Sequence, residues 1–185
     1  MQPVVIRTER LVLSATTEAD IDQIERLCQD ELMRDMLASL PWPYTREHAE
    51  HFATQLVPAG WASADSLTWS IRTSDDGPHL GSIGWRRGLH DVGFWMGAPH
   101  RGHGYMTEAV RGVCAWVFAE LGEERIGWEA LVGNLASARV ARAAGFRFDG
   151  EAASDVCFRD GSRPQAWHAH IDRSDDGTPH HGWPL

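Results

Sequence analysis

The stretch GAPHRGHGYMTEAV, residues 97–110, places three glycines and two histidines directly before a pattern typical of an amphipathic helix. Beyond Gly104 the apolar side chains recur at intervals of three and four residues, namely Met106, Ala109, Val110, Val113, Val117 and Leu121. This spacing predicts a helix with one buried face, and Gly122 is placed to end it. The glycine-rich turn is therefore interpreted as the start of a helix.

The start of a helix suits an anion, because its first amides have no intrahelical partners and the helix dipole adds positive potential. Gly102 and Gly104 would let a phosphate approach these amides closely, and Arg101 could add a charge-assisted hydrogen bond. A glycine-rich turn before a helix is more often only a turn. The stretch also lacks the Gly-Lys-Ser or Gly-Lys-Thr of a Walker loop and the G-x-G-x-x-G spacing of a dinucleotide fingerprint. The surrounding sequence must therefore decide.

Strand and helix patterns alternate on both sides of this turn, which indicates an α+β domain. Thr17 with Asp20 and, further on, Thr45 are placed to cap helices. The expected strands cover residues 10–15, 67–73, 79–85, 91–97, 125–132, 146–152, 155–158 and 165–171. The expected helices cover residues 16–28, 46–56, 105–121 and 135–146. We expect one domain over residues 1–172 and a polar, solvated tail over residues 173–185.

Composition narrows the class of protein. The chain has 185 residues, 43% hydrophobic and 23% charged, and no apolar run long enough for a bilayer or a signal peptide, so we expect a cytoplasmic protein away from membranes. The three cysteines are widely spaced, so we expect neither a disulfide framework nor a metal site. A net charge of −9 disfavours nucleic acid and favours a cationic substrate or partner.

The motif RGHGYM, residues 101–106, resembles the Arg-x-x-Gly-x-Gly/Ala signature of the Gcn5-related N-acetyltransferase (GNAT) superfamily, with Met106 as a loose match to the last position. The segments TERLVL, GSIGW, DVGFWMGAPHRGHGYMTEAV and GNLASARVARAAGFRFDG follow in the expected order. Together they resemble the branch of RimJ and RimL, which acetylates ribosomal-protein N-termini. The resemblance covers nearly the whole chain except the tail.

This resemblance implies a mostly antiparallel, strongly twisted sheet flanked by helices, with acetyl-CoA held where two central strands splay apart. The pyrophosphate would lie on the amides of residues 102–106, and the pantetheine arm would pair with residues 94–96 like an added strand. The residues that it assigns to the cofactor are Phe94, Trp95, Met96, Arg101, Gly102, His103, Gly104, Tyr105, Met106 and Asn134. Asn134 is equally placed to cap the helix that follows it.

A neutral amine must attack the thioester, so a group that removes a proton is expected. Asp91 stands where many relatives carry a glutamate, and it could accept the proton directly or through water. It could equally be a solvent-facing strand end. His100 and His103 are less favoured, because their position beside the phosphates suits polar or anion contacts better.

The thiolate must also leave, and many relatives place a tyrosine four residues before a Gly-Phe pair to protonate it. Ala141 stands there in this chain. Ser137 lies one helical turn earlier and could hydrogen-bond the sulfur, although it could also be an ordinary first-turn serine.

The acceptor is the least determined part. Trp42 and Tyr44 fall in the region that resembles the substrate side and are our candidate substrate-binding residues, with Trp61 and Trp69 near them in sequence as further members of an aromatic box. We expect an N-acetyltransferase that acts on a protein N-terminus or on a small amine. The alternative is a catalytically silent module that binds or senses acyl-CoA. The sequence leaves the acceptor's identity and a homodimer open.

Overall fold

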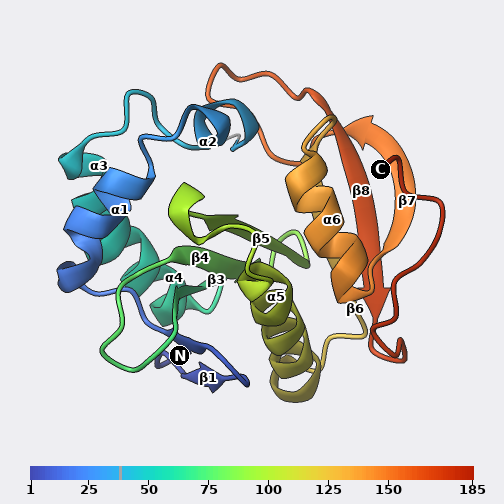
Figure 1. Cartoon of the computed structure of the whole chain (residues 1–185), viewed down its shortest axis with the longest axis horizontal. Helices are drawn as coiled ribbons and strands as arrows, with labels where there is room; N and C mark the ends of the chain where they lie inside the picture. The colour runs from blue at the N-terminus through green and yellow to red at the C-terminus, as the bar shows by residue number, and fades with distance from the viewer. Residues whose placement is uncertain (38) are drawn as a thin grey trace.

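The computed structural model describes residues 1–37 and 39–185 and contains one eight-stranded sheet flanked by helices (Figure 1). The strand order is β1-β2-β3-β4-β5-β6-β8-β7. The strands are β1 (Ile6–Arg7), β2 (Val12–Ser14), β3 (Ser66–Arg72), β4 (Gly81–Arg86), β5 (Asp91–Met96), β6 (Arg125–Leu131), β7 (Arg147–Ala153) and β8 (Gln165–Asp172). Of the described helices, none is long and apolar enough to cross a membrane.

The helices are α1 (Ile21–Leu27), α2 (Glu31–Met36), α3 (Arg46–His51), α4 (Val57–Ser63), α5 (Tyr105–Trp116) and α6 (Leu135–Ala144). Short helical turns extend three of them: η1 (Glu18–Asp20) precedes α1, η2 (Phe52–Leu56) joins α3 to α4, and η4 (Val117–Leu121) continues α5. A further turn, η3 (Ala98–His100), follows β5. The predicted α+β class with a mostly antiparallel sheet is confirmed, since every described strand pair except β5–β6 is antiparallel.

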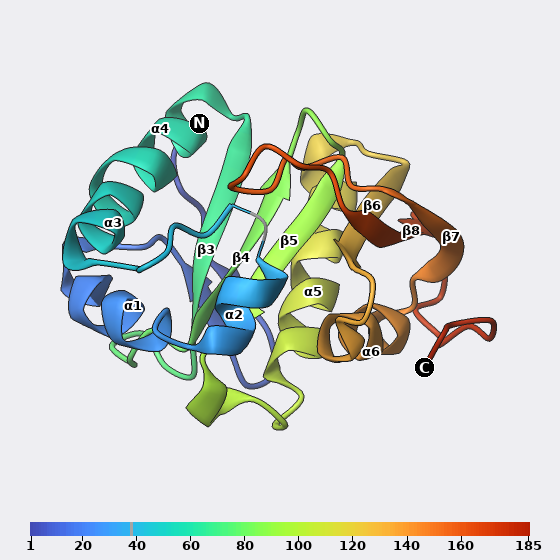
Figure 2. The same cartoon turned by 90° about the horizontal axis from the view of Figure 1, so that it is seen from above.

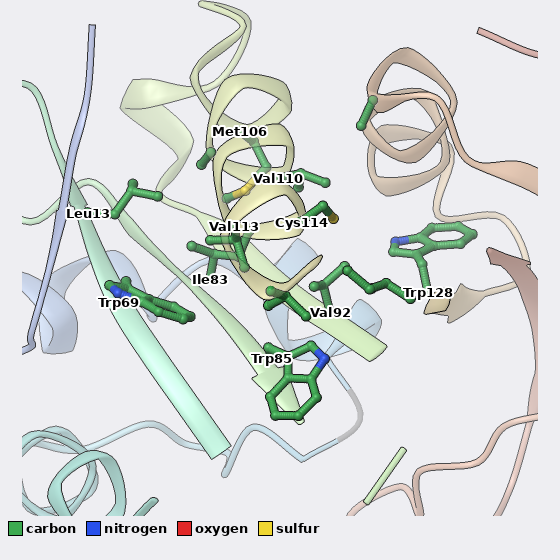
Figure 3. Packing of buried hydrophobic residues seen from close by; sticks show 14 of the residues in the cluster. Leu13, Trp69, Ile83, Trp85, Val92, Met106, Val110, Val113, Cys114 and Trp128 are labelled. Carbon is green, nitrogen blue, oxygen red and sulfur yellow. The ribbon is translucent and has the colours of Figure 1, made fainter. Parts of the chain in front are cut away.

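Helix α5 packs on the apolar face of the central strands. Val110, Val113 and Cys114 of α5 are buried in one apolar cluster with Ile83 of β4 and Val92 of β5 (Figure 3). The interval of three and four residues read from the sequence therefore marks the buried stripe, and Gly122 ends the helix with a φ of 74°. Burial of this face supplies the main hydrophobic stabilisation of the fold.

The opposite face of the central strands is covered by the N-terminal helices. Ile21 and Ile24 of α1, together with Ala49 of α3, form a second apolar cluster, which we call the α1 cluster. Trp95 of β5 packs against it. The capping boxes at Thr17 and Thr45 are confirmed. Side chains of the central strands therefore alternate between two apolar layers, one beneath α5 and one beneath α1 and α3.

The sheet separates between β5 and β6. These parallel strands are paired at one position, Asp91 with Gly127, where the Gly127 N–H donates to His90 O at 2.7 Å. β4 pairs with β5 along the full length of β5. One edge of residues 92–96 therefore has no strand partner within the described chain, as expected for splayed strands.

Three local predictions are corrected. Helix α2 was not anticipated, although Asp30 caps it by accepting from the Leu32 N–H at 2.9 Å. Residues 155–158 form no strand, because the segment 154–164 instead leaves β7 as a long loop, which we call the strap. The strap crosses from β8 toward α2 (Figures 1 and 2). The helix predicted for residues 46–56 extends to Ser63 through η2 and α4.

The C-terminal segment is mostly exposed, but part of it packs on the domain. Trp183 packs against Trp128 of β6 and Phe148 of β7, with ring centroids 5.6 and 5.4 Å apart, and the Arg142 Nε–H donates to His180 O at 3.3 Å. Residues 173–185 therefore cover part of the sheet, because Trp183 packs on an aromatic surface.

A buried polar layer lies between β3 and the residues before η1. Ser70 Oγ lies 2.8 Å from His79 Nδ1 and 3.0 Å from Thr16 Oγ1, while His79 Nε2 has no hydrogen-bond partner among the described groups. Beside it, Arg72 donates to the buried carboxylate of Asp20 at 2.6 Å. Burial lowers the pKa of His79 to about 4, outweighing the favourable field of Asp20.

This burial predicts acid sensitivity. The folded-state pKa of His79 lies below its value in the unfolded chain, so below roughly pH 6.5 only the unfolded chain takes up that proton. We expect stability to fall as the pH drops from about 6.5 to 4, by about 3 kcal/mol from this group. His79→Gln, measured beside wild type by urea unfolding across this range, should flatten that dependence. Parallel curves for the two proteins would contradict the prediction.

Candidate functional site

The turn between β5 and α5 presents bare amides. Gly102 and Gly104 adopt φ angles of 80° and 77°, in the left-handed region that favours glycine. Gly104 is the N-cap residue of α5. Within the described chain, no N-cap side chain accepts a hydrogen bond from the first amides of this helix. The first amides of a 12-residue helix are thus available to an anion, as the sequence predicted.

Arg101 is engaged within the protein. Its Nε–H donates to Met96 O at 2.9 Å, and its Nη2 lies 2.5 Å from Asp30 Oδ2. The guanidinium therefore joins the end of β5 to the start of α2. Because a guanidinium has five N–H donors, these two contacts leave others that could donate to an anion.

Glu108, in the first turn of α5, would repel an anion if its carboxylate faced the turn. Instead it accepts from Thr8 Oγ1 at 2.5 Å, from the Arg10 N–H at 2.8 Å and from Arg10 Nε at 2.7 Å. Burial alone would raise the pKa of Glu108, but these donors lower it. The negative charge at this end of α5 is therefore neutralised locally.

Arg10 also borders the turn directly. Its guanidinium lies 5.1 Å from the centroid of the Tyr105 ring, and its Nη1–H donates to His103 O at 3.0 Å. The rings of His103 and Tyr105 stack with centroids 5.5 Å apart. Arg10 was not among the predicted site residues, because it stands almost a hundred positions earlier in the chain.

The unpaired edge of β5 leads to this turn. Phe94 packs with the core beneath α5, whereas Trp95 faces the α1 cluster, as the alternation of a strand requires. Met96 is buried at the end of the strand. An extended ligand lying along β5 would therefore meet backbone groups on its edge and end at the α5 amides.

Helix α6 borders the other side of the separation. Asn134 Oδ1 accepts from the Ser137 N–H at 3.1 Å, so its capping role is confirmed, and the Trp128 indole N–H donates to Ser137 Oγ at 3.2 Å. The hydroxyl hydrogen of Ser137 stays available for another acceptor. Ala141 is fully buried and supplies no acid.

Asp91 lies where β5 and β6 still touch. Both carboxylate oxygens accept from Arg86, at 2.8 Å from Nε and 2.5 Å from Nη2. Burial raises the pKa of Asp91, while Arg86 opposes that shift and the nearby Glu129 reinforces it. Asp91 is therefore a buried, paired carboxylate and not a solvent-facing strand end.

The aromatic box predicted from the sequence does not assemble. Trp61 and Trp69 are buried in the main core, edge to face, with centroids 5.0 Å apart. Tyr44 is buried in the α1 cluster, and burial raises its pKa. Trp42 is half-buried under the Arg34 guanidinium, 5.4 Å from the ring centroid. These aromatic residues are near one another in sequence, but the fold places Trp61 and Trp69 in the main core and Tyr44 in the α1 cluster.

Polar groups on β6 and β8 were missed. Glu129 and His168 are paired positions on these strands, and Asp155 of the strap lies beside them. The available signal was partial alternation, since Glu129 interrupts the apolar run of RIGWEALV, and His168 and His170 stand two residues apart in QAWHAHI. Sequence spacing could not show that they share one face with Asp91.

A shallow hollow of about 590 Å³ lies elsewhere, lined by Leu89, His90, Gly122, Glu123, Glu124, Arg125 and Gly127. It borders the opposite end of β5 from the α5 amides and contains none of the predicted cofactor residues. We therefore place the candidate site at the separated ends of β5 and β6.

Comparison with known proteins shows the family. The model of the acetyltransferase (GNAT) domain matches residues 10–147, which include the turn, Asp91 and Ser137. The probable N-acetyltransferase YjcK of Bacillus subtilis (strain 168) is 42% identical over 65 residues, 35% of this chain and 36% of that protein. The match thus spans about a third of that relative's length.

Two solved structures share the fold. The ribosomal-protein-S5-alanine acetyltransferase from Vibrio fischeri has a TM-score of 0.73 and 19% identity, covering 95% of this chain and 100% of that one. RimL, a ribosomal L7/L12 alpha-N-protein acetyltransferase in complex with coenzyme A, has a TM-score of 0.77 and 15% identity, covering 91% and 98%. At these identities the likeness concerns the fold.

The Asp91–Arg86 pair generates a prediction. Arg86→Met leaves a buried carboxylate without its donors, so at pH 7 we expect a loss of stability of about 3 kcal/mol, the lower part of the range for a broken buried pair because Arg86 is a third exposed. The pKa of Asp91 should rise further, since Arg86 holds it down. Protonation would then relieve the cost, and the loss should shrink toward pH 5.

The measurement is urea unfolding at both pH values, with Arg87→Met as the control. Arg87 is exposed and donates to Ala64 O at 3.0 Å without contacting a carboxylate in the described chain. An equal loss at pH 7 and pH 5 for Arg86→Met would show that the carboxylate does not carry the effect.

Proposed function

The chain belongs to the acetyltransferase (GNAT) domain family, and we propose that it transfers the acetyl group of acetyl-CoA to a primary amine. The observation that carries the proposal is the continuity of one path, from the unpaired edge of β5 to the open amides of α5. Such a path suits a ligand with an extended amide-containing arm and an anionic end, which are the parts of coenzyme A.

The turn fits the pyrophosphate on its own geometry. A Cβ placed on Gly102 would meet no atom of the chain within 4 Å, so the space above its amide is open, and at Gly104 a Cβ would lie 3.4 Å from Arg10 Nη2. The amides of residues 102–106 would hold the pyrophosphate, and the edge of residues 94–96 would pair with the pantetheine arm. Asn134 and Ser137 border this path from α6. When bound, acetyl-CoA supplies an acetyl thioester.

The acceptor would approach from the other face of the sheet. Helices α5 and α6 cover the cofactor face, while the face carrying Asp91 looks toward α2 and the strap. The net charge of −9 favours a cationic acceptor over an anionic one. A protein N-terminus and a small amine both remain candidates, and a substrate contact by Trp42 stays a prediction.

Asp91 is the proton acceptor that the family resemblance indicates. Its burial favours the protonated form, which suits a group that must take up a proton. The two hydrogen bonds from Arg86 act against this uptake, because they stabilise the ionised carboxylate, although each oxygen keeps a second lone pair for a proton. The base role of Asp91 therefore stays a prediction.

The activity is tested by release of thiol from acetyl-CoA with a panel of acceptors. The panel contains a short peptide with a free N-terminus, 1,5-diaminopentane and a matched alcohol. We expect release with one of the amines and none with the alcohol. Tight binding of acetyl-CoA with no turnover of any amine would instead favour the silent binding module.

Gly104→Val tests the turn. A β-branched residue resists a φ of 77° and would fill the space above the amides, so we expect acetyl-CoA affinity to fall at least tenfold while the protein stays folded. Gly122→Val is the matched control, since Gly122 has a φ of 74° with open space around it at the far end of α5. Calorimetry that finds unchanged affinity in Gly104→Val would reject the pyrophosphate site.

Ser137→Ala tests the departing thiolate. A hydroxyl that stabilises the sulfur through a hydrogen bond to a charged group contributes about 1.5 to 3 kcal/mol, so turnover should fall roughly 10-fold to 150-fold with acetyl-CoA affinity unchanged. Unchanged turnover would mean that the thiolate leaves unaided. A loss of affinity would make Ser137 a binding residue.

A further inference from the structure

Three polar residues form a cluster beside the separated strands: Glu129 of β6, His168 of β8 and Asp155 of the strap. One ligand atom from each lies within 4.8 Å of the other two. His168 Nε2 is 4.0 Å from Glu129 Oε2, and His168 Nδ1 is 4.0 Å from Asp155 Oδ2. These distances are too long for hydrogen bonds, so the three groups surround a small space without closing it.

The cluster lies beside the part of β6 that no longer pairs with β5. β5 and β6 are last paired at Asp91 and Gly127, and Glu129 stands two residues further along β6, paired with His168. Side chains two residues apart on a strand share a face. Glu129 and His168 therefore lie on the same face as Asp91, opposite the helices α5 and α6.

The strap holds the cluster in place. Ser154 Oγ–H and the Asp155 N–H donate to the two oxygens of Glu129 at 2.9 and 2.8 Å. Arg163 donates to Asp155 O at 2.9 Å, and Arg159 donates to Arg34 O of α2 at 2.6 Å. The carboxylate of Glu129 is thus fixed in orientation by its two donors.

The dimensions suit a primary ammonium group. Three ligand atoms that lie within 4.8 Å of one another can all be about 2.8 Å from one nitrogen placed in or above their plane, which is a hydrogen-bond distance. A primary ammonium has three N–H donors, one for each of these atoms. His168 Nε2 is buried and has no hydrogen-bond partner in the described chain, so it has an unused acceptor capacity.

A small divalent metal fits less well. Tetrahedral ligands around zinc at about 2.1 Å lie about 3.4 Å apart, whereas His168 lies 4.0 Å from both Glu129 and Asp155. The cluster therefore matches a hydrogen-bonding cation better than a coordinated one.

We infer that Glu129, Asp155 and His168 receive the acceptor's primary ammonium group, and that the His168 imidazole, not Asp91, takes its first proton. This inference rests on the proposed function, since it assigns the acceptor side of the same site. Asp91 is then a positioning residue, whose carboxylate stays paired with Arg86 beside the reacting nitrogen.

The steps balance as follows. One N–H proton passes to His168, and the freed nitrogen lone pair bonds to the thioester carbonyl carbon. The carbon–sulfur bond then breaks, its electron pair leaves with sulfur, and the amide nitrogen loses a second proton. The thiolate takes up one of these two protons, and the other is released to solvent.

Carboxylates lie near His168 on two sides, since Glu129 faces it from β6 and Asp155 from the strap. The other titratable or charged groups on this side are Asp91 of β5, Arg86 of β4, Arg163 of the strap, and His170 of β8 with its partner Asp149 of β7. Arg86 is occupied by Asp91, and Arg163 donates to the strap backbone.

The test compares pH profiles of kcat/KM between pH 6 and 10 for acetyl transfer to 1,5-diaminopentane and to a short peptide with a free N-terminus. Wild type should level off where imidazoles titrate, roughly between pH 5 and 8. His168→Gln should lose 10²-fold to 10⁴-fold near pH 7 and rise tenfold per pH unit toward the pKa of the free amine, about 10.4 for an alkylamine. Acetyl-CoA affinity should not change.

Two variants complete the comparison. Asp91→Asn should keep the wild-type shape of the profile at a lower rate, and His181→Gln, an exposed histidine of the C-terminal segment, should match wild type throughout. A profile that loses its plateau in Asp91→Asn and keeps it in His168→Gln would overturn the inference and assign the proton to Asp91. Wild-type profiles in both variants would overturn it in favour of water.

A binding measurement separates this inference from the proposed function. Titration of propylammonium into wild type, followed by the imidazole resonances, should shift the His168 signals more than those of His181, and Glu129→Gln should weaken that binding at least tenfold. A missing response at His168 would overturn the ammonium site even if the enzyme turns over amines. Absence of turnover with every amine, with propylammonium still bound, would reject the proposed function instead.

Discussion

The structure depends on the point at which β5 and β6 stop pairing. A parallel pair that continued to Met96 would satisfy its backbone groups within the sheet and leave no edge for a ligand. Here pairing ends after Asp91 and Gly127, and the unpaired edge of β5 continues into the amides of α5. Buried backbone groups need partners, so this edge is stable only where a ligand or water supplies them.

The separation also divides the site by chemistry. On one side, α5 and α6 cover the strands with apolar side chains. On the other side, Asp91, Glu129 and His168 share the opposite face of the sheet. A thioester placed between the layers would therefore meet its leaving-group side in the α6 layer and its acceptor in the polar layer.

Arginines hold the elements around the opening. Arg86 fixes Asp91 at its closed end, Arg101 joins β5 to α2 through Asp30, and Arg159 ties the strap to the backbone of α2. A guanidinium offers five N–H donors in a rigid plane, so a single side chain can bind a carboxylate or carbonyls from two segments. Segments without regular pairing thereby keep defined positions over the face of the sheet that carries Asp91.

The sequence by itself determined what depends on local pattern: the stripe of α5, the capping residues Thr17, Thr45 and Asn134, and the turn at Gly102 and Gly104. Periodicity, capping and left-handed backbone are properties of a few adjacent residues, so they can be read from the chain.

Tertiary structure alone decided which distant groups meet. It brought Arg10 to the turn, paired Arg86 with Asp91, divided Trp42 and Tyr44 from Trp61 and Trp69, and folded Asp155 over Glu129 and His168. These contacts arise from strand order and from the path of a loop without regular structure. Neither leaves a local signal, because pairing across a sheet depends on the packing of the whole chain.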